Sequence, residues 1–182
     1  MSEMDVGETS SGDMINAVVS SLDAMNETKL VSEKILSFIS QREIYAVSIS
    51  RIKEIIEYEV VTHVPLAPDY IRGVINLRGR VVPVVDLSAR LGRQQGVVGK
   101  RSCIVIFEVI FADESLEIGL AVDAVNEVLD VAQENLEQVP AFGSNIRDDF
   151  IAAMAHIDDD FIVLLDIDRV LSIEELADFS DQ

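Results

Sequence analysis

The sequence predicts a mostly β protein in which two small β-barrels pack side by side. Apolar residues make up 49% of the 182 residues while only 5% are aromatic, and an aliphatic, β-branched core of this kind favours many short strands. The second observation is an internal repeat, because residues 44–56 align with residues 117–129. Each copy also holds a later pair of apolar runs. A copy therefore contains roughly five short strands, the content of a small closed sheet.

Residues 1–33 precede the repeat. Their composition and spacing predict an extension that is partly disordered and partly helical. The first twelve residues are polar, which is typical of a disordered terminus. Asp13 is a candidate N-cap, and apolar residues follow it at helical spacing. We interpret this segment as a short helix that packs back on the domain, with a docking helix for a partner as the alternative. Its apolar face comprises Met14, Ile15, Val18, Val19, Leu22 and Met25.

The strands are predicted in order along the rest of the chain. Alternating apolar residues at 36–40 predict the first strand, and residues 44–49 predict the second. Two apolar runs joined by a turn predict a hairpin at residues 70–87. The second copy repeats this hairpin at residues 150–167. A capping box at residues 172–175 then predicts a short closing helix.

The two copies differ at the tip of this hairpin. The first copy reads Asn-Leu-Arg-Gly-Arg at residues 76–80, whereas the second reads His-Ile-Asp-Asp-Asp at residues 156–160. Both copies keep the apolar runs on either side, so the strands do not require the arginines. The tip of the first hairpin, with Arg78 and Arg80, is therefore a candidate contact site.

The charge of the chain restricts its partners. The 33 acidic and 14 basic residues give a net charge of −19. Nucleic-acid binding and docking on anionic lipid both need a basic surface, and we expect neither. Half of the basic residues, seven of fourteen, fall between residues 72 and 101. Two interpretations stay open: a solvated loop that balances the local field, or a contact patch for an acidic partner.

The sequence carries no recognisable catalytic motif. It has no Gly-rich phosphate loop or dinucleotide fingerprint, and its two histidines have no Cys or His at metal-ligand spacing. We therefore expect no cofactor and no metal. Cys103 lies in an apolar run and is interpreted as a core residue. No run reaches the ~20 apolar residues of a membrane span and no secretory signal is present, so we expect a cytoplasmic protein without direct membrane insertion.

Glu54 is the acid of greatest interest. It lies among the apolar residues Ile52, Ile55 and Ile56, and it could pair with Arg78 if the first copy folds back on itself. A partly buried pair would fix the hairpin tip. A surface glutamate without a partner is the alternative.

Several of these motifs occur together in one known family. Residues 68–87 contain Pro-Asp-Tyr-Ile-Arg-Gly-Val, Asn-Leu-Arg-Gly and Val-Val-Pro-Val-Val-Asp-Leu in that order. The second copy adds Gly-Leu-Ala-Val-Asp-Ala-Val at residues 119–125 and Leu-Leu-Asp-Ile at residues 164–167. With these motifs the chain resembles the CheW family of chemotaxis coupling proteins over about residues 34–175.

This resemblance implies a fold and a function. Residues 34–175 would form a CheW-like domain of two interleaved subdomains, each an SH3-like five-stranded β-barrel, and residues 176–182 would form a C-terminal tail. The protein would be a non-enzymatic adaptor that couples the cytoplasmic tips of methyl-accepting chemoreceptors to a CheA-like histidine kinase. It would be cytoplasmic and recruited to membrane-associated receptor arrays.

The resemblance also implies partner-binding residues. Arg78 and Glu54 correspond to positions implicated in partner contacts or in a supporting salt bridge. Ile49 and Ile52 would lie on an apolar edge facing a groove between the subdomains, where the receptor tip docks. Arg80, beside Arg78, completes the expected site.

Alternative functions remain open at this point. The N-terminal extension leaves room for a regulatory CheW-like module of a specialised pathway such as surface motility. The regulatory fragment of a larger kinase would share the fold. A small hydrolase with an unrecognised pair of carboxylates would belong to another class; it predicts a polar cleft with converging acids, whereas the adaptor predicts an apolar groove beside Arg78.

Overall fold

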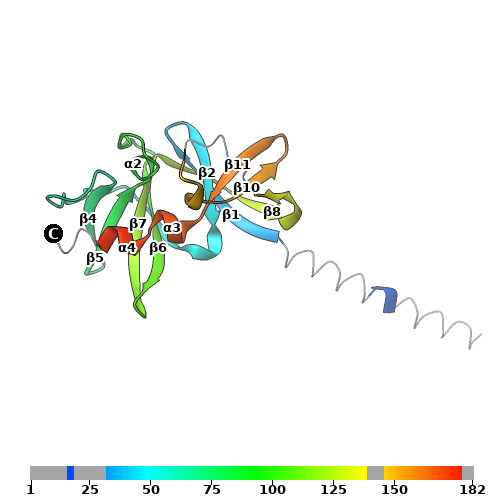
Figure 1. Ribbon diagram of the computed structural model, residues 1–182, viewed down its shortest axis with the longest axis horizontal. Coiled ribbons are helices and arrows are strands. Elements are labelled where there is room, and N and C mark those ends of the chain that lie inside the picture. Colours follow the sequence, from blue (N-terminus) through cyan, green and yellow to red (C-terminus); the bar gives the residue numbers. More distant parts are fainter. Residues whose placement is uncertain (1–15, 19–31, 139–145, 178–182) are drawn as a thin grey trace, which may run out of the picture.

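The protein is built mainly from strands that form two sheets lying side by side, as the computed structural model in Figure 1 shows. The structure describes residues 16–18, 32–138 and 146–177. Residues 16–18 are helical, and the rest of the helix predicted after Asp13 lies outside the described residues.

The elements follow the two copies of the repeat. The first copy contributes β1 (Ser32–Ser40), β2 (Glu43–Ser48), η1 (Ile49–Arg51), β3 (Ile52–Glu57), β4 (Ile71–Leu77), β5 (Arg80–Asp86) and α2 (Leu87–Arg90). The second contributes β6 (Cys103–Phe111), β7 (Glu114–Val122), β8 (Ala124–Ala132), η2 (Gln133–Asn135), β9 (Leu136–Glu137), η3 (Asp148–Phe150), β10 (Ile151–Ile157), β11 (Asp160–Leu165), α3 (Ile167–Val170) and α4 (Ile173–Ala177).

The two copies exchange strands. One sheet has the order β8-β1-β2-β11-β10-β9, and the other has the order β3-β6-β7-β5-β4. Strands β1 and β2 therefore join the sheet of the second copy, while β3 crosses to pair with β6. The parallel pairs β2–β11 and β5–β7 connect strands of different copies within each sheet. Each sheet consequently depends on both halves of the chain.

The five-stranded sheet closes on itself. Strands β3 and β4 lie at opposite ends of its order, yet Glu54 of β3 contacts the β4–β5 turn at Arg78. An isolated bridge between Thr62 and Val74 joins the segment after β3 to β4. Closure of this kind makes a small barrel whose interior is filled by side chains. The mostly β fold of two SH3-like subdomains predicted from the sequence is confirmed.

Three apolar clusters fill the molecule. One occupies the five-stranded barrel, with Ile104 and Ile106 of β6 at its centre. A second occupies the other sheet around Ile35 and Leu164. The third lies between the sheets and includes Phe107, whose side chain faces opposite to those of its β6 neighbours as strand alternation requires. The two subdomains thus share the largest of the three clusters.

The hairpin β4–β5 turns at Arg78 and Gly79. Their φ angles are 52° and 84°, as a two-residue type I′ turn requires, and the Gly79 amide donates to the Asn76 side chain at 2.9 Å. The equivalent hairpin β10–β11 turns at Asp158 with φ of 53°. The prediction that both copies keep the strands while the tips differ is confirmed.

Aspartates after each hairpin cap the following helix. Asp86 accepts a hydrogen bond from the Ala89 amide at 2.8 Å, and Asp166 does the same for the first turn of α3. Asp86 also forms an ion pair with the Arg72 guanidinium at 2.6 Å, and the Asp86 side chain is only 3% exposed. This shared cap explains why the repeat retains Asp at both positions.

Several arginines between residues 72 and 101 serve the fold. Arg72 pairs with Asp86, Arg93 pairs with Glu43 at 2.7 Å, and the buried Arg90 donates to the Val170 carbonyl at 2.7 Å. These side chains are held by partners within the chain. Three of the seven basic residues of this segment are thus engaged in the fold. Arg78 and Arg80 are exposed, and a contact patch around them stays a prediction.

Candidate partner-binding site

The tip of hairpin β4–β5 carries an exposed ion pair. The Arg78 guanidinium donates to both carboxylate oxygens of Glu54, at 2.7 and 2.9 Å. The Arg78 side chain is 69% exposed and that of Glu54 is 21% exposed. The positive φ of Arg78 places its side chain on the turn, and Glu54 meets it from the opposite edge of the barrel. Of the two alternatives for Glu54, the structure has the pair with Arg78, and the role of this pair in binding stays a prediction.

Further charges extend from this pair across the barrel. Glu117 of β7 lies between Arg80, at 2.9 Å, and Lys53, and its side chain is only 6% exposed. The hydrogen bond from Lys53 holds the pKa of Glu117 below its ordinary value, against the raising effect of burial. Lys53 also lies 3.8 Å from Glu108. We call the six residues the charged band: Lys53, Glu54, Arg78, Arg80, Glu108 and Glu117.

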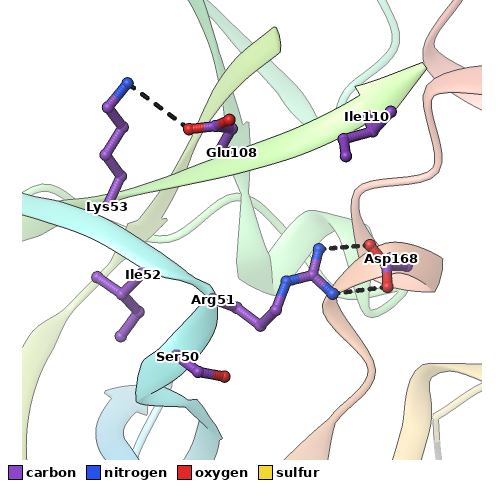
Figure 2. Close-up of a pocket in the computed structure, with 7 residues that line it drawn as sticks. All are labelled: Ser50, Arg51, Ile52, Lys53, Glu108, Ile110 and Asp168. Carbon is purple, nitrogen blue, oxygen red and sulfur yellow. Dashed lines mark hydrogen bonds and ion pairs between the residues drawn. The ribbon is translucent and has the colours of Figure 1, made fainter. Parts of the chain in front are cut away.

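The charged band leads into a groove. Figure 2 shows this hollow, which has a volume of about 520 Å³ and is bordered by the segment where the chain crosses between the sheets. Arg51 donates to both oxygens of Asp168 at 2.7 and 2.6 Å. This pair joins η1 of the first copy to α3 of the second. The contact lowers the pKa of Asp168, chiefly through the hydrogen bonds from Arg51. The lining residues are Ser50, Arg51, Ile52, Lys53, Glu108, Ile110 and Asp168.

The predicted site residues only partly coincide with this groove. Ile52 lines it, and Lys53 connects it to the band that contains Arg78 and Arg80. Ile49 is 38% exposed, but it is not among the lining residues. The expectation of an apolar groove is wrong, because most of its lining side chains are polar or charged. The reason is that the ends of the crossing segment are fixed by ion pairs rather than by apolar packing.

The acids of the groove do not converge on one another. Asp168 is held by Arg51 at one side, and Glu108 faces Lys53 at the other (Figure 2). Each carboxylate therefore has a cation as its nearest charged neighbour. A hydrolase with two cooperating carboxylates would need the opposite arrangement in this groove.

Some of the residues that line the groove were not predicted from the sequence. Arg51 and Asp168 are 117 positions apart, so no local spacing could connect them. Ile110 gives a weak signal, because Ile-Phe at residues 110–111 is apolar directly before a turn. Apolar residues in that position usually extend a strand, and only the structure shows that Ile110 is exposed.

The described residues show no feature that would hold a metal or cross a membrane. Within residues 16–18, 32–138 and 146–177, no group of three or more His, Cys, Asp or Glu side chains could hold a metal ion. The helices in these ranges also lack the length and apolar character of a membrane span.

Comparisons with known proteins agree with the fold and the motifs. The family model of the CheW-like domain matches residues 34–175. The chain is 32% identical over 147 residues to the chemotaxis protein CheW of Klebsiella aerogenes, covering 81% of this chain and 86% of the relative. It is 36% identical to the CheW of Rhizobium meliloti, covering 72% of this chain and 82% of the relative.

A solved structure has the same architecture. The crystal structure of the scaffolding protein TtCheW from Thermoanaerobacter tengcongensis superposes with a TM-score of 0.67 at 32% identity, covering 74% of this chain and 84% of that one. Together with the strand exchange, the Asn-Leu-Arg-Gly turn and the family match, this similarity shows that the chain belongs to the CheW family of chemotaxis proteins.

Proposed function

We propose that this protein is a non-enzymatic adaptor that couples the cytoplasmic tips of methyl-accepting chemoreceptors to a CheA-like histidine kinase. The observation that carries the proposal is the exposed Arg78–Glu54 pair at the start of a charged band that leads into the groove. The fold does not require this pair, since the equivalent hairpin has Asp158 in place of Arg78. The two tips carry opposite charges, and positive charge at one exposed tip of an acidic protein suits contact with a partner of complementary charge.

The groove suits the tip of a helical hairpin. A partner tip lying in it would contact Ile52 with its apolar residues, and Arg78 would orient the tip through charge. The exposed Ile49 does not line the groove but precedes its lining residue Ser50, and would be met at the margin. The small apolar area and the many charges favour a modest, reversible interface, as in signalling assemblies. The kinase would bind elsewhere on the barrels, so that receptor and kinase are held together, and the adaptor would act in the cytoplasm at receptor arrays.

Co-sedimentation with receptor-tip fragments and a CheA kinase tests the proposal. We expect wild type to assemble with both, and Arg78→Asp to assemble poorly because it places two acids together. Glu54→Lys places two cations together and should also assemble poorly. Lys100→Asp, a charge reversal at an exposed position in the same barrel, is the matched control.

The double variant Arg78→Asp with Glu54→Lys separates two roles of the pair. It restores an ion pair with reversed polarity. Assembly should remain weak if the partner contacts Arg78 directly, and recover if the pair only supports the turn. Unchanged assembly in every variant, with folding intact by circular dichroism, would show that this site is not used.

A further inference from the structure

The hairpin between β6 and β7 extends beyond its sheet. Strand β3 pairs with β6 only between Cys103 and Phe107, and β5 pairs with β7 only between Gly119 and Ala121. Residues 108–117 therefore pair only with each other among the described strands. Figure 1 shows this two-stranded ribbon projecting past the body of the molecule. We call residues 108–117 the arm; its base is anchored by Val109, which is buried in the cluster between the sheets.

The arm exposes apolar side chains. Ile110 is 79% exposed, and Phe111 and Leu116, on the other face, are 39% and 38% exposed. Beyond its anchored base the ribbon has no third strand, and a two-stranded ribbon is at best marginally stable in water. Ile110 is exposed on the face toward Ile52, and both side chains line one hollow. The arm thus has the features of a surface that a partner covers.

The equivalent hairpin of the first copy behaves differently. At the β1–β2 tip, the Gln41 amide donates to Asp123 at 2.7 Å, and the Gln41 side chain donates to the Gln94 carbonyl at 3.0 Å. That tip is tied to the body of the protein. The arm tip at Ala112 and Asp113 has the same two-residue turn, with φ of 51° and 64°, but among the described residues no hydrogen bond ties it to another element. The β6–β7 hairpin of the second copy therefore projects from the protein, whereas the equivalent β1–β2 hairpin of the first copy is held against it.

The arm borders the groove. Ile110 and Glu108 line the same hollow as Ile52 and Lys53, so a molecule lying in the groove also meets the near face of the arm (Figure 2). Toward its end the arm is acidic, with exposed Asp113 and Glu114 at the turn. A partner that extends out of the groove along the arm would meet apolar surface first and negative charge next.

We propose that the arm is a second wall of the groove, which holds the receptor tip through Ile110 and selects a tip that carries Lys or Arg beside its apolar residues. The inference rests on the proposed function of the groove. Ile110 supplies apolar contact, while Asp113 and Glu114 supply charge complementarity that raises the association rate and discriminates against acidic tips.

Binding of a soluble chemoreceptor-tip fragment to the full-length protein tests this proposal. Ile110→Ser should weaken binding about tenfold, as expected for truncation of an interface anchor. Asp113→Lys combined with Glu114→Lys should slow association and reduce its dependence on salt. Val97→Ser is the matched control, because Val97 is an 88% exposed apolar residue on a loop away from the groove. Thermal unfolding should be the same for all variants, since each replaced side chain is exposed.

The outcomes separate the arm from the groove. If Ile52→Ser weakens binding while Ile110→Ser stays within about twofold of wild type, the groove is used and the arm proposal is overturned. An unchanged salt dependence in the lysine double variant would overturn the proposed selection for basic tips. If wild type does not bind the fragment at all, the proposed function and the arm fall together.

Discussion

Replacement of Arg90 tests how the two copies are held together. Arg90 comes from α2 of the first copy, and its side chain is only 4% exposed. It donates to the Val170 carbonyl at 2.7 Å and pairs with Glu175 at 2.6 Å, both in the second copy. Its guanidinium also lies over the rings of Tyr70 and Phe150, 4.8 Å from each centroid. Arg90→Ala removes all of these contacts at once.

The expected loss follows from these contacts. A hydrogen bond that involves a charged group contributes about 1.5–3 kcal/mol, and each cation–π contact contributes about 0.5–2 kcal/mol. The Glu175 side chain is 38% exposed, so water screens it and we assign nothing to that ion pair. The hydrogen bond and the two cation–π contacts together amount to about 2.5–7 kcal/mol. We expect Arg90→Ala to lower the free energy of unfolding by this amount.

Urea denaturation followed by circular dichroism measures the change. Arg90→Lys should recover only part of the loss. The planar guanidinium of arginine can stack on two rings and donate hydrogen bonds in its plane at the same time, and the compact ammonium group of lysine cannot. Lys100→Ala, at an exposed position, should stay within about 0.5 kcal/mol of wild type. A loss below about 1 kcal/mol for Arg90→Ala would refute the claim that this residue joins the two copies.

Three further perturbations have defined outcomes. Gly73→Ala should prevent folding or cost more than about 4 kcal/mol, because φ is +143° and the added Cβ would lie 2.0 Å from the Thr62 carbonyl oxygen; thermal unfolding measures this. Asp86→Ala should cost about 3–5 kcal/mol in urea, since it removes a helix cap and half of a buried ion pair. The pKa of Glu117 is lowered in the folded state by Lys53, so its stabilisation is complete above the ordinary pKa of 4.5 and is lost as pH falls through the lowered pKa. Glu117→Gln should therefore lose less stability than wild type between about pH 6 and pH 3 in urea titrations.

The strands and turns could be predicted from the sequence because their signals are local. Apolar alternation located the strands, and the turn between them follows from Gly79, which adopts positive φ without strain. The repeat showed that the tips vary while the flanking strands persist. The Glu54–Arg78 pair was one of two alternatives, because an acid among apolar residues can pair if the first copy folds back on itself, and the sequence equally allows a surface glutamate without a partner.

Other features depend on pairings that sequence cannot supply. Strand β3 pairs with β6 of the second copy. The apolar pattern of the sequence does not determine this pairing, because the strands of both copies have similar patterns. For the same reason, charge counting could not separate Arg78, which is exposed, from Arg72 and Arg90, which have partners from distant segments. The polar character of the groove also depends on a contact between Arg51 and Asp168 across the two copies.

The exchange of strands has a consequence for synthesis on the ribosome. Strands β1 and β2 emerge early, but their sheet is completed only by β8, β10 and β11. At translation rates of roughly 5–20 residues per second, the about 117 residues from the end of β2 to the end of β11 (165 − 48) take roughly 6–23 s to appear. During that interval the apolar faces of β1 and β2 have no completed sheet to join. The nascent chain is therefore expected to need chaperone protection, and neither copy should fold when it is expressed alone.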